Sequence, residues 1–160
     1  MTQSDATERG AAVRFPPPLV FLVGLLLGVA FQYALMPAPA PVARTISVPA
    51  GIIILLIGVS FVAAARILFL RTGQNPIPWK PSPELIFKGP YRFTRNPMYV
   101  GITLFETGLG VALNNLWISL FAVPALLTVH FIAVLPEESY LAKKFGESYD
   151  RYRAQVRRYL

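Results

Sequence analysis

Four apolar segments that carry almost no charge are the feature that most limits how this chain can fold. They cover residues 19–36, 49–70, 97–113 and 116–135. Each is close to the ~20 residues that a helix needs to cross a bilayer. Charged residues make up only 14% of the chain, against about 25% in soluble domains. The sequence therefore predicts an all-α integral membrane protein, a single domain over residues 1–160 with four transmembrane helices.

The distribution of basic residues predicts which way the helices cross the membrane. Lys and Arg are dense between the second and third segments and after the fourth, whereas the connections on the other side carry only Arg44. Since cytoplasmic loops are rich in Lys and Arg, we expect both termini in the cytoplasm, at the inner membrane if the source is bacterial. A cleaved signal peptide is the alternative for the first segment. Asp5 and Glu8 before it offset the basic residues there, which favours a retained helix.

The net charge of +7 indicates contact with anionic lipid headgroups rather than nucleic acid, because the basic residues flank apolar segments. The chain has no cysteine and one histidine. Disulfides and sites built on thiolates or on several histidines are therefore excluded, and we expect no metal centre.

The connections between the segments are also informative. Only Asn114 and Asn115 separate the last two segments, which predicts a tight antiparallel hairpin. Prolines between residues 71 and 96 exclude a continuous helix there and favour an ordered loop. Beyond Pro136, apolar side chains recur at helical spacing and predict one amphipathic helix at the membrane surface, which could bend at Gly146. They are Leu141, Phe145, Tyr152, Val156 and Tyr159.

Two polar motifs lie next to the last two apolar segments. The first is GPYRFTRNPMYVG at residues 89–101, and the second is EESYLAKKFGESYDRYRAQVRR at residues 137–158. The hairpin would bring them together. In combination they resemble the isoprenylcysteine carboxyl methyltransferases and the related phospholipid N-methyltransferases, over about residues 75–158. The resemblance implies an integral membrane enzyme that uses S-adenosylmethionine to methylate a membrane lipid or another lipophilic acceptor.

A site for S-adenosylmethionine needs a carboxylate for its cationic end, donors for its own carboxylate and aromatic surface for its adenine. The motifs supply the acids Glu137 and Glu138, donors that include the region of Asn75, and aromatic rings such as Phe93. The candidate catalytic residues are Arg95, Asn96 and Glu138, and the candidate cofactor-binding residues are Tyr91, Arg92, Asn96, Pro97, Tyr99, Gly108, Gly110, Glu137 and Glu138. Gly108 and Gly110 are included because they match a Gly-x-Gly element of the phospholipid enzymes.

Other interpretations of these residues stay open. The two acids could simply begin a helix after Pro136, the arginines and Tyr99 could anchor the chain at the membrane surface, and the Gly-x-Gly could serve helix packing. We expect Tyr149 and Tyr152 to pack at the interface.

One departure from the resemblance bears on activity. Many members have histidine where this chain has Asn96, and asparagine cannot take a proton. A non-catalytic lipid-binding protein is therefore one alternative. A reductase similar to the sterol reductases, with NADPH as cofactor, is the other.

Two ionisable residues lie inside the apolar segments. Glu106 is seven residues beyond Tyr99, and His130 is seven residues before Glu137. Ionisable groups in a membrane usually face a partner or a cavity. We expect Glu106 and His130 to form a buried pair, structural rather than catalytic.

Overall fold

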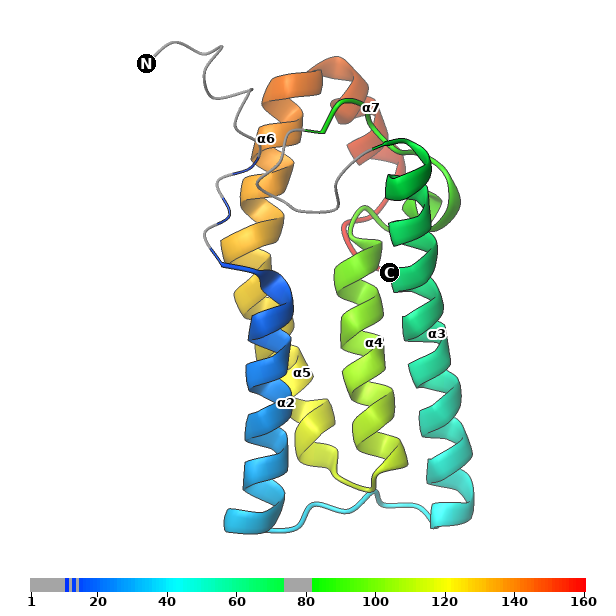
Figure 1. The fold of residues 1–160 in the computed structure, drawn as a ribbon, viewed down its shortest axis with the longest axis vertical. Helices are drawn as coiled ribbons and strands as arrows, with labels where there is room; N and C mark the ends of the chain where they lie inside the picture. Colours follow the sequence, from blue (N-terminus) through cyan, green and yellow to red (C-terminus); the bar gives the residue numbers. More distant parts are fainter. Residues whose placement is uncertain (1–10, 12, 14, 74–81) are drawn as a thin grey trace.

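The computed structural model describes residues 11, 13, 15–73 and 82–160, and the regular structure of these residues is entirely helical. Figure 1 shows α2 (Pro17–Ala34), α3 (Arg44–Arg71), α4 (Pro97–Ala112) and α5 (Leu116–Val129) side by side, with α6 (Leu135–Phe145) and α7 (Glu147–Gln155) at one end. Within the described residues, three helices are long and apolar enough to cross a membrane: α2, α3 and the continuous helix Leu116–Phe145. This confirms an all-helical membrane protein. The region of Asn75 lies outside the described residues.

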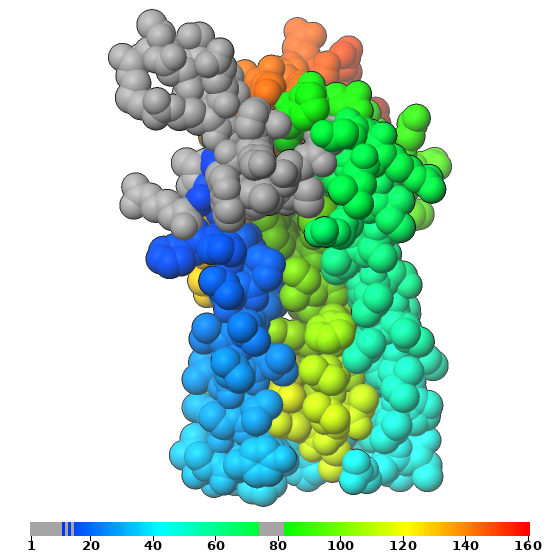
Figure 2. All heavy atoms as spheres, viewed as in Figure 1, coloured from blue at the N-terminus to red at the C-terminus, as the bar shows by residue number. Residues whose placement is uncertain are grey.

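The outer surface of the bundle is apolar, as a lipid-facing surface requires. Figure 2 shows α4 and α5 between α2 and α3 on one face. Large apolar side chains of α2 and α3 are exposed on the bundle surface, among them Leu22, Leu26, Ile53 and Leu56. In water such a surface would be unfavourable, since soluble monomers rarely expose large contiguous apolar patches.

Glycines allow α3 and α4 to approach closely. Gly51 and Gly58 of α3 face Gly108 and Gly101 of α4. A Cβ atom added to Gly108 would lie 2.4 Å from the backbone nitrogen of Leu55, and one added to Gly58 would lie 2.5 Å from the Gly101 carbonyl oxygen. Small residues at such contacts are how membrane helices gain close packing. The α3–α4 contact is accordingly the most extensive in the bundle, and it fixes where the N-terminus of α4 lies.

Two asparagines organise the opposite end of the bundle. Asn114 adopts a left-handed conformation with φ of 58°, which asparagine tolerates better than most residues. Its side-chain oxygen accepts a hydrogen bond from the Ala40 nitrogen at 2.8 Å. Asn115 caps α5 by accepting from the Trp117 nitrogen and donates to the Gly28 carbonyl oxygen. The connection between α4 and α5 is thereby tied to α2 and to the α2–α3 loop.

Two helix boundaries differ from those expected. α3 begins at Arg44 rather than at residue 49, with Pro49 inside its N-terminal part, where the proline removes only one backbone hydrogen bond. The last apolar segment does not end at residue 135. A π-helical turn, His130–Val134, joins α5 to α6, and Pro136 lies in the first turn of α6. Proline is tolerated in the first turn of a helix, because the backbone N–H groups there have no partner within the helix. Here the π-helical turn before it keeps α5 and α6 continuous.

The single amphipathic helix expected beyond Pro136 is instead two helices. Gly146 has φ of 50°, which interrupts the helix and separates α6 from α7. Residues with a side chain rarely adopt that conformation, whereas glycine adopts it readily. α7 ends at Gln155, and the chain is extended at Val156. Tyr159 therefore lies on a returning segment and not on a helix face.

The prediction that Glu106 and His130 form a pair is wrong. His130 Nδ1 lies 2.9 Å from the Tyr159 hydroxyl, and Glu106, 2% exposed, has an Oε2 atom with no hydrogen-bond partner in the described residues. The register explains this. Gly110 contacts Ser119, so Glu106 is level with about residue 123, roughly two turns from His130.

Replacement of Gly108 by leucine should destabilise the bundle. The added side chain would meet the α3 backbone, and overpacking typically costs about 1–3 kcal/mol. We expect a melting temperature in detergent several degrees lower for Gly108→Leu. Ala63→Leu, which adds bulk at an exposed position of α3, should leave it nearly unchanged. Equal melting temperatures for Gly108→Leu and the wild type would show that α3 and α4 do not pack so closely.

Replacement of Glu106 by leucine should stabilise the protein. A buried polar group without a partner costs about 1–3 kcal/mol, and leucine fills a similar volume. We expect Glu106→Leu to raise the melting temperature in detergent, and Glu106→Gln, which keeps a polar group, to raise it less. A lower melting temperature for Glu106→Leu would mean that the carboxyl group has a stabilising partner.

Candidate active site

The two polar motifs meet at the end of the bundle where α4 begins and α6 leaves it. The short 3₁₀ helix η1, Gly89–Arg92, precedes α4, and Pro97 is the first residue of α4. Proline suits that position because the first backbone N–H groups of a helix have no partner within it. Residues 93–96 thus form a bend between η1 and α4, and this bend faces the start of α6.

A cavity of about 80 Å³ lies at this meeting point. Five of the residues singled out from the sequence line it: Tyr91, Arg95, Asn96, Glu137 and Glu138. The other lining residues are Phe69, Ser82, Glu84, Leu85, Ile86, Leu141 and two tyrosines of α7, Tyr149 and Tyr152. The cavity therefore combines acids, donors and aromatic rings, the three kinds of group that the sequence led us to expect together.

Glu138 forms an ion-pair cluster with two arginines. Arg158 donates to both carboxylate oxygens, from Nε at 3.0 Å and from a terminal nitrogen at 2.8 Å. Arg95 lies 3.4 Å from Oε1. Bidentate pairs of this kind are among the stronger hydrogen-bonding arrangements in proteins. The charge of Glu138 is therefore compensated within the protein.

The C-terminal segment reaches the same place through its backbone. The Arg157 carbonyl oxygen accepts from the Arg95 nitrogen at 2.9 Å. The Arg158 carbonyl oxygen accepts from the Thr94 hydroxyl at 2.9 Å and from the Asn96 side-chain amide at 3.1 Å. Sequence reasoning missed Thr94 and Arg158, because the basic end was interpreted only as a membrane-surface helix. The helix break at Gly146 was the available signal that the chain could turn back.

Glu137 has a different environment from Glu138. Its Oε1 accepts a hydrogen bond from the Tyr99 hydroxyl at 2.9 Å, and it forms no ion pair within the described part of the chain. Burial, and then the nearby Glu137 carboxylate, raise the pKa of the Tyr91 phenol. Tyr91 therefore stays protonated and can donate a hydrogen bond. Glu137 thus offers the cavity a carboxylate that lacks a cationic partner.

Arg95 carries a hydrogen-bond donor that has no acceptor among the described residues. Its side chain is 8% exposed, and its Nε is buried with no hydrogen-bond acceptor in the described residues. Burial raises the pKa of the neighbouring Tyr149 phenol to about 12, so that group also remains a neutral hydrogen-bonding partner. A buried donor without an acceptor is uncommon. A carboxylate supplied by a ligand would satisfy it.

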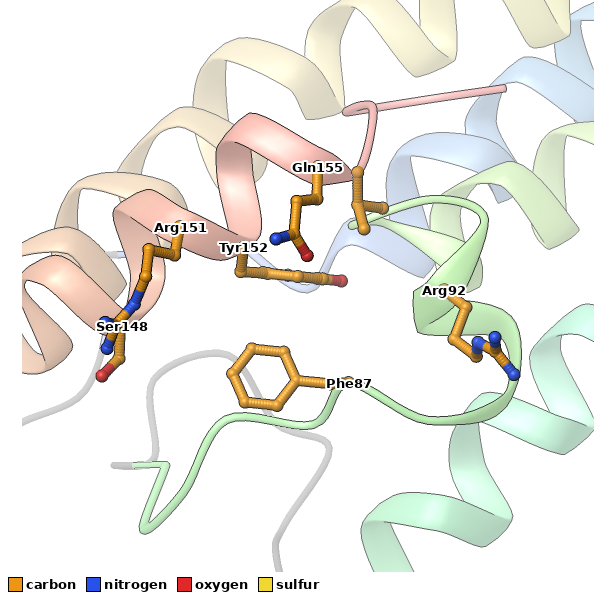
Figure 3. A pocket seen from close by; sticks show the side chains of 7 residues that line it. Phe87, Arg92, Ser148, Arg151, Tyr152 and Gln155 are labelled. Atoms are coloured by element: carbon orange, nitrogen blue, oxygen red, sulfur yellow. The ribbon is translucent and has the colours of Figure 1, made fainter.

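Several of the predicted site residues lie outside the cavity. Gly108 packs on Leu55 of α3, and Gly110 packs on Ser119 of α5. These glycines therefore lie in helix contacts and do not line the cavity. Pro97 is buried at the start of α4, and Tyr99 is buried and donates its hydroxyl to Glu137. Arg92 is exposed and lines a second hollow, shown in Figure 3.

Comparison with known proteins identifies the family of this chain. The phospholipid methyltransferase family pattern matches residues 45–148, well over half of the chain. A curated relative, the protein-S-isoprenylcysteine O-methyltransferase of Schizosaccharomyces pombe (strain 972 / ATCC 24843), is 33% identical over 72 residues. The match covers 45% of this chain and 30% of the relative. No solved structure matches. By the extent of the family match, this chain belongs to the phospholipid methyltransferase family of membrane methyltransferases.

Proposed function

We propose that this protein transfers a methyl group from S-adenosylmethionine to a lipophilic acceptor at the cytoplasmic face of a membrane. In this proposal α4 is a fourth spanning helix, paired with α5 as a hairpin, and both termini are cytoplasmic. Membership of the family and the three long apolar helices support it. The observation that carries it is that one cavity holds two incompletely partnered groups: among the described residues, the Glu137 carboxylate forms no ion pair, and the buried Nε of Arg95 has no acceptor.

The cavity residues match the charges of the methyl donor. S-adenosylmethionine, when bound, supplies a methyl group on a positively charged sulfonium, beside an amino-acid end with both an ammonium and a carboxylate. Glu137 would balance the positive charge of the ammonium group, and Arg95 Nε would donate a hydrogen bond to the carboxylate of the ligand. Tyr91, Tyr149 and Tyr152 supply aromatic surface. The described residues enclose about 80 Å³, whereas ligand pockets usually hold about 300–1,000 Å³, so they form one part of the complete site.

The protein would contribute mainly by orientation. Displacement at a methyl carbon requires acceptor and leaving group in line, and alignment can supply much of the rate enhancement. Glu138, held by Arg158 and Arg95, would keep the bend before α4 in place. An amine acceptor would have to lose a proton first, whereas a carboxylate acceptor would mainly need desolvation. The acceptor itself, a membrane lipid or another lipophilic molecule, is part of the proposal.

Calorimetric titration in detergent with S-adenosylhomocysteine and, separately, with NADPH tests the cofactor. We expect binding of S-adenosylhomocysteine and none of NADPH. Binding of NADPH alone would favour the reductase alternative, which the family match does not favour. Binding of neither would favour a lipid-binding protein without catalytic activity.

Glu137 and Glu138 should respond differently to neutralisation. Because Glu137 forms no ion pair with a described residue, we expect Glu137→Gln to weaken S-adenosylhomocysteine binding at least tenfold, about 1.4 kcal/mol, with little change in melting temperature. Because Glu138 is bound to Arg158 and Arg95, we expect Glu138→Gln to lower the melting temperature. Calorimetry and thermal unfolding measure the two effects. Unchanged affinity in Glu137→Gln would remove Glu137 from the site.

Asn96 should tolerate histidine but not leucine. Its amide donates to the Arg158 carbonyl oxygen, and an imidazole can donate in the same way. We expect Asn96→His to retain S-adenosylhomocysteine binding and Asn96→Leu to lose most of it while circular dichroism shows an unchanged helix content. Normal binding by Asn96→Leu would show that this position does not support the site.

A further inference from the structure

A second, larger hollow lies beside the candidate active site. It measures about 590 Å³ and is lined by Arg92 of η1, by four residues of α7, and by Phe87 and Val156. Tyr152 lines both this hollow and the smaller cavity. On α7, Ser148, Arg151 and Gln155 follow one another at helical spacing on one side of the helix. Figure 3 shows Arg151 and Ser148 at one end of the hollow and Arg92 at the other, with the rings of Phe87 and Tyr152 between them.

The hollow carries two positive charges that form no ion pair with the described residues. Neither Arg92 nor Arg151 forms an ion pair with a described residue. The lining residues include no acid. The next arginine of α7 is different, since Arg153 pairs with Asp150 at 3.0 Å. Arg151 and Arg92 are therefore distinguished from the other bases of this region by facing one hollow without a counter-charge.

The remaining polar groups of the hollow are suited to donate hydrogen bonds. The Ser148 hydroxyl and the Gln155 amide line it together with the two guanidinium groups. The Tyr152 hydroxyl donates to the Tyr91 carbonyl oxygen at 2.8 Å, so its ring rather than its oxygen is offered to a ligand. That ring and the Phe87 ring lie 5.0 Å apart, edge to face. The hollow thus combines donors at its ends with an apolar middle.

We propose that this hollow binds the phosphate group of an anionic lipid headgroup. Guanidinium groups and hydroxyls are the donors that recognise phosphate, and the volume lies within the usual range for ligand pockets. The phosphate lies at the Arg151 and Ser148 end, and the aromatic rings pack against the apolar part of the headgroup. The hollow lies at the end of the bundle with the basic residues, where anionic headgroups are expected to be concentrated. The proposal does not depend on methyl transfer.

Calorimetry with the full-length protein in a neutral detergent tests this site. The probes are dihexanoyl phosphatidylglycerol, sn-glycerol 3-phosphate and inorganic phosphate, at constant ionic strength. We expect the lipid to bind most tightly and Arg151→Gln to weaken its binding at least fivefold, with a smaller loss for Arg92→Gln. Arg153→Gln is the matched control, because it removes the same charge from the same helix outside the hollow. Circular dichroism should show the same melting temperature for all three variants.

Each alternative result is decisive. Equal weakening by Arg153→Gln and Arg151→Gln would show attraction to general positive charge and would overturn the site. Unchanged binding by Arg151→Gln would overturn it as well. Inorganic phosphate that binds as tightly as the lipid, with the same dependence on Arg151, would support the phosphate site and overturn the lipid as its source.

Discussion

The carboxylate of Glu138 joins the parts of the chain that form the candidate site. It accepts two hydrogen bonds from Arg158 and lies 3.4 Å from Arg95. Through these contacts α6, the bend before α4 and the C-terminal segment are held together, and the backbone bonds from Thr94, Arg95 and Asn96 reinforce the same junction. Removing Glu138 would leave the buried Arg95 guanidinium without its carboxylate partner, which is strongly unfavourable. The shape of the cavity therefore depends on this cluster.

Adjacent acids on one helix can have separate roles because consecutive side chains point about 100° apart. Glu138 points toward the arginines, and Glu137 points toward Tyr99 and the cavity. The rest of the bundle keeps this difference in place. The glycine contact between α3 and α4 fixes Tyr99, and the continuous helix Leu116–Phe145 fixes Glu137. A structural charge pair and an available carboxylate thus lie side by side.

The helices and the meeting of the two motifs could be predicted from the sequence, since long apolar runs and helix periodicity are local signals. The return of the C-terminal segment to Glu138 could not, because Gly146 indicates only that the helix can break there and not which residue the following chain meets. The continuity of the helix past Pro136 and the separation of Glu106 from His130 were missed for a related reason. The helix continues past Pro136 because of the π-helical turn before it. Glu106 and His130 are separated by the register of α4 against α5, which three-dimensional packing determines.

The proposed methyl transfer can be measured directly. Purified protein would be incubated with methyl-labelled S-adenosylmethionine and total membrane lipid, and the products would be analysed by mass spectrometry. We expect a labelled methyl group in the lipid fraction, at a level that excess S-adenosylhomocysteine suppresses. No label in any lipophilic product, together with no binding of S-adenosylhomocysteine, would contradict it.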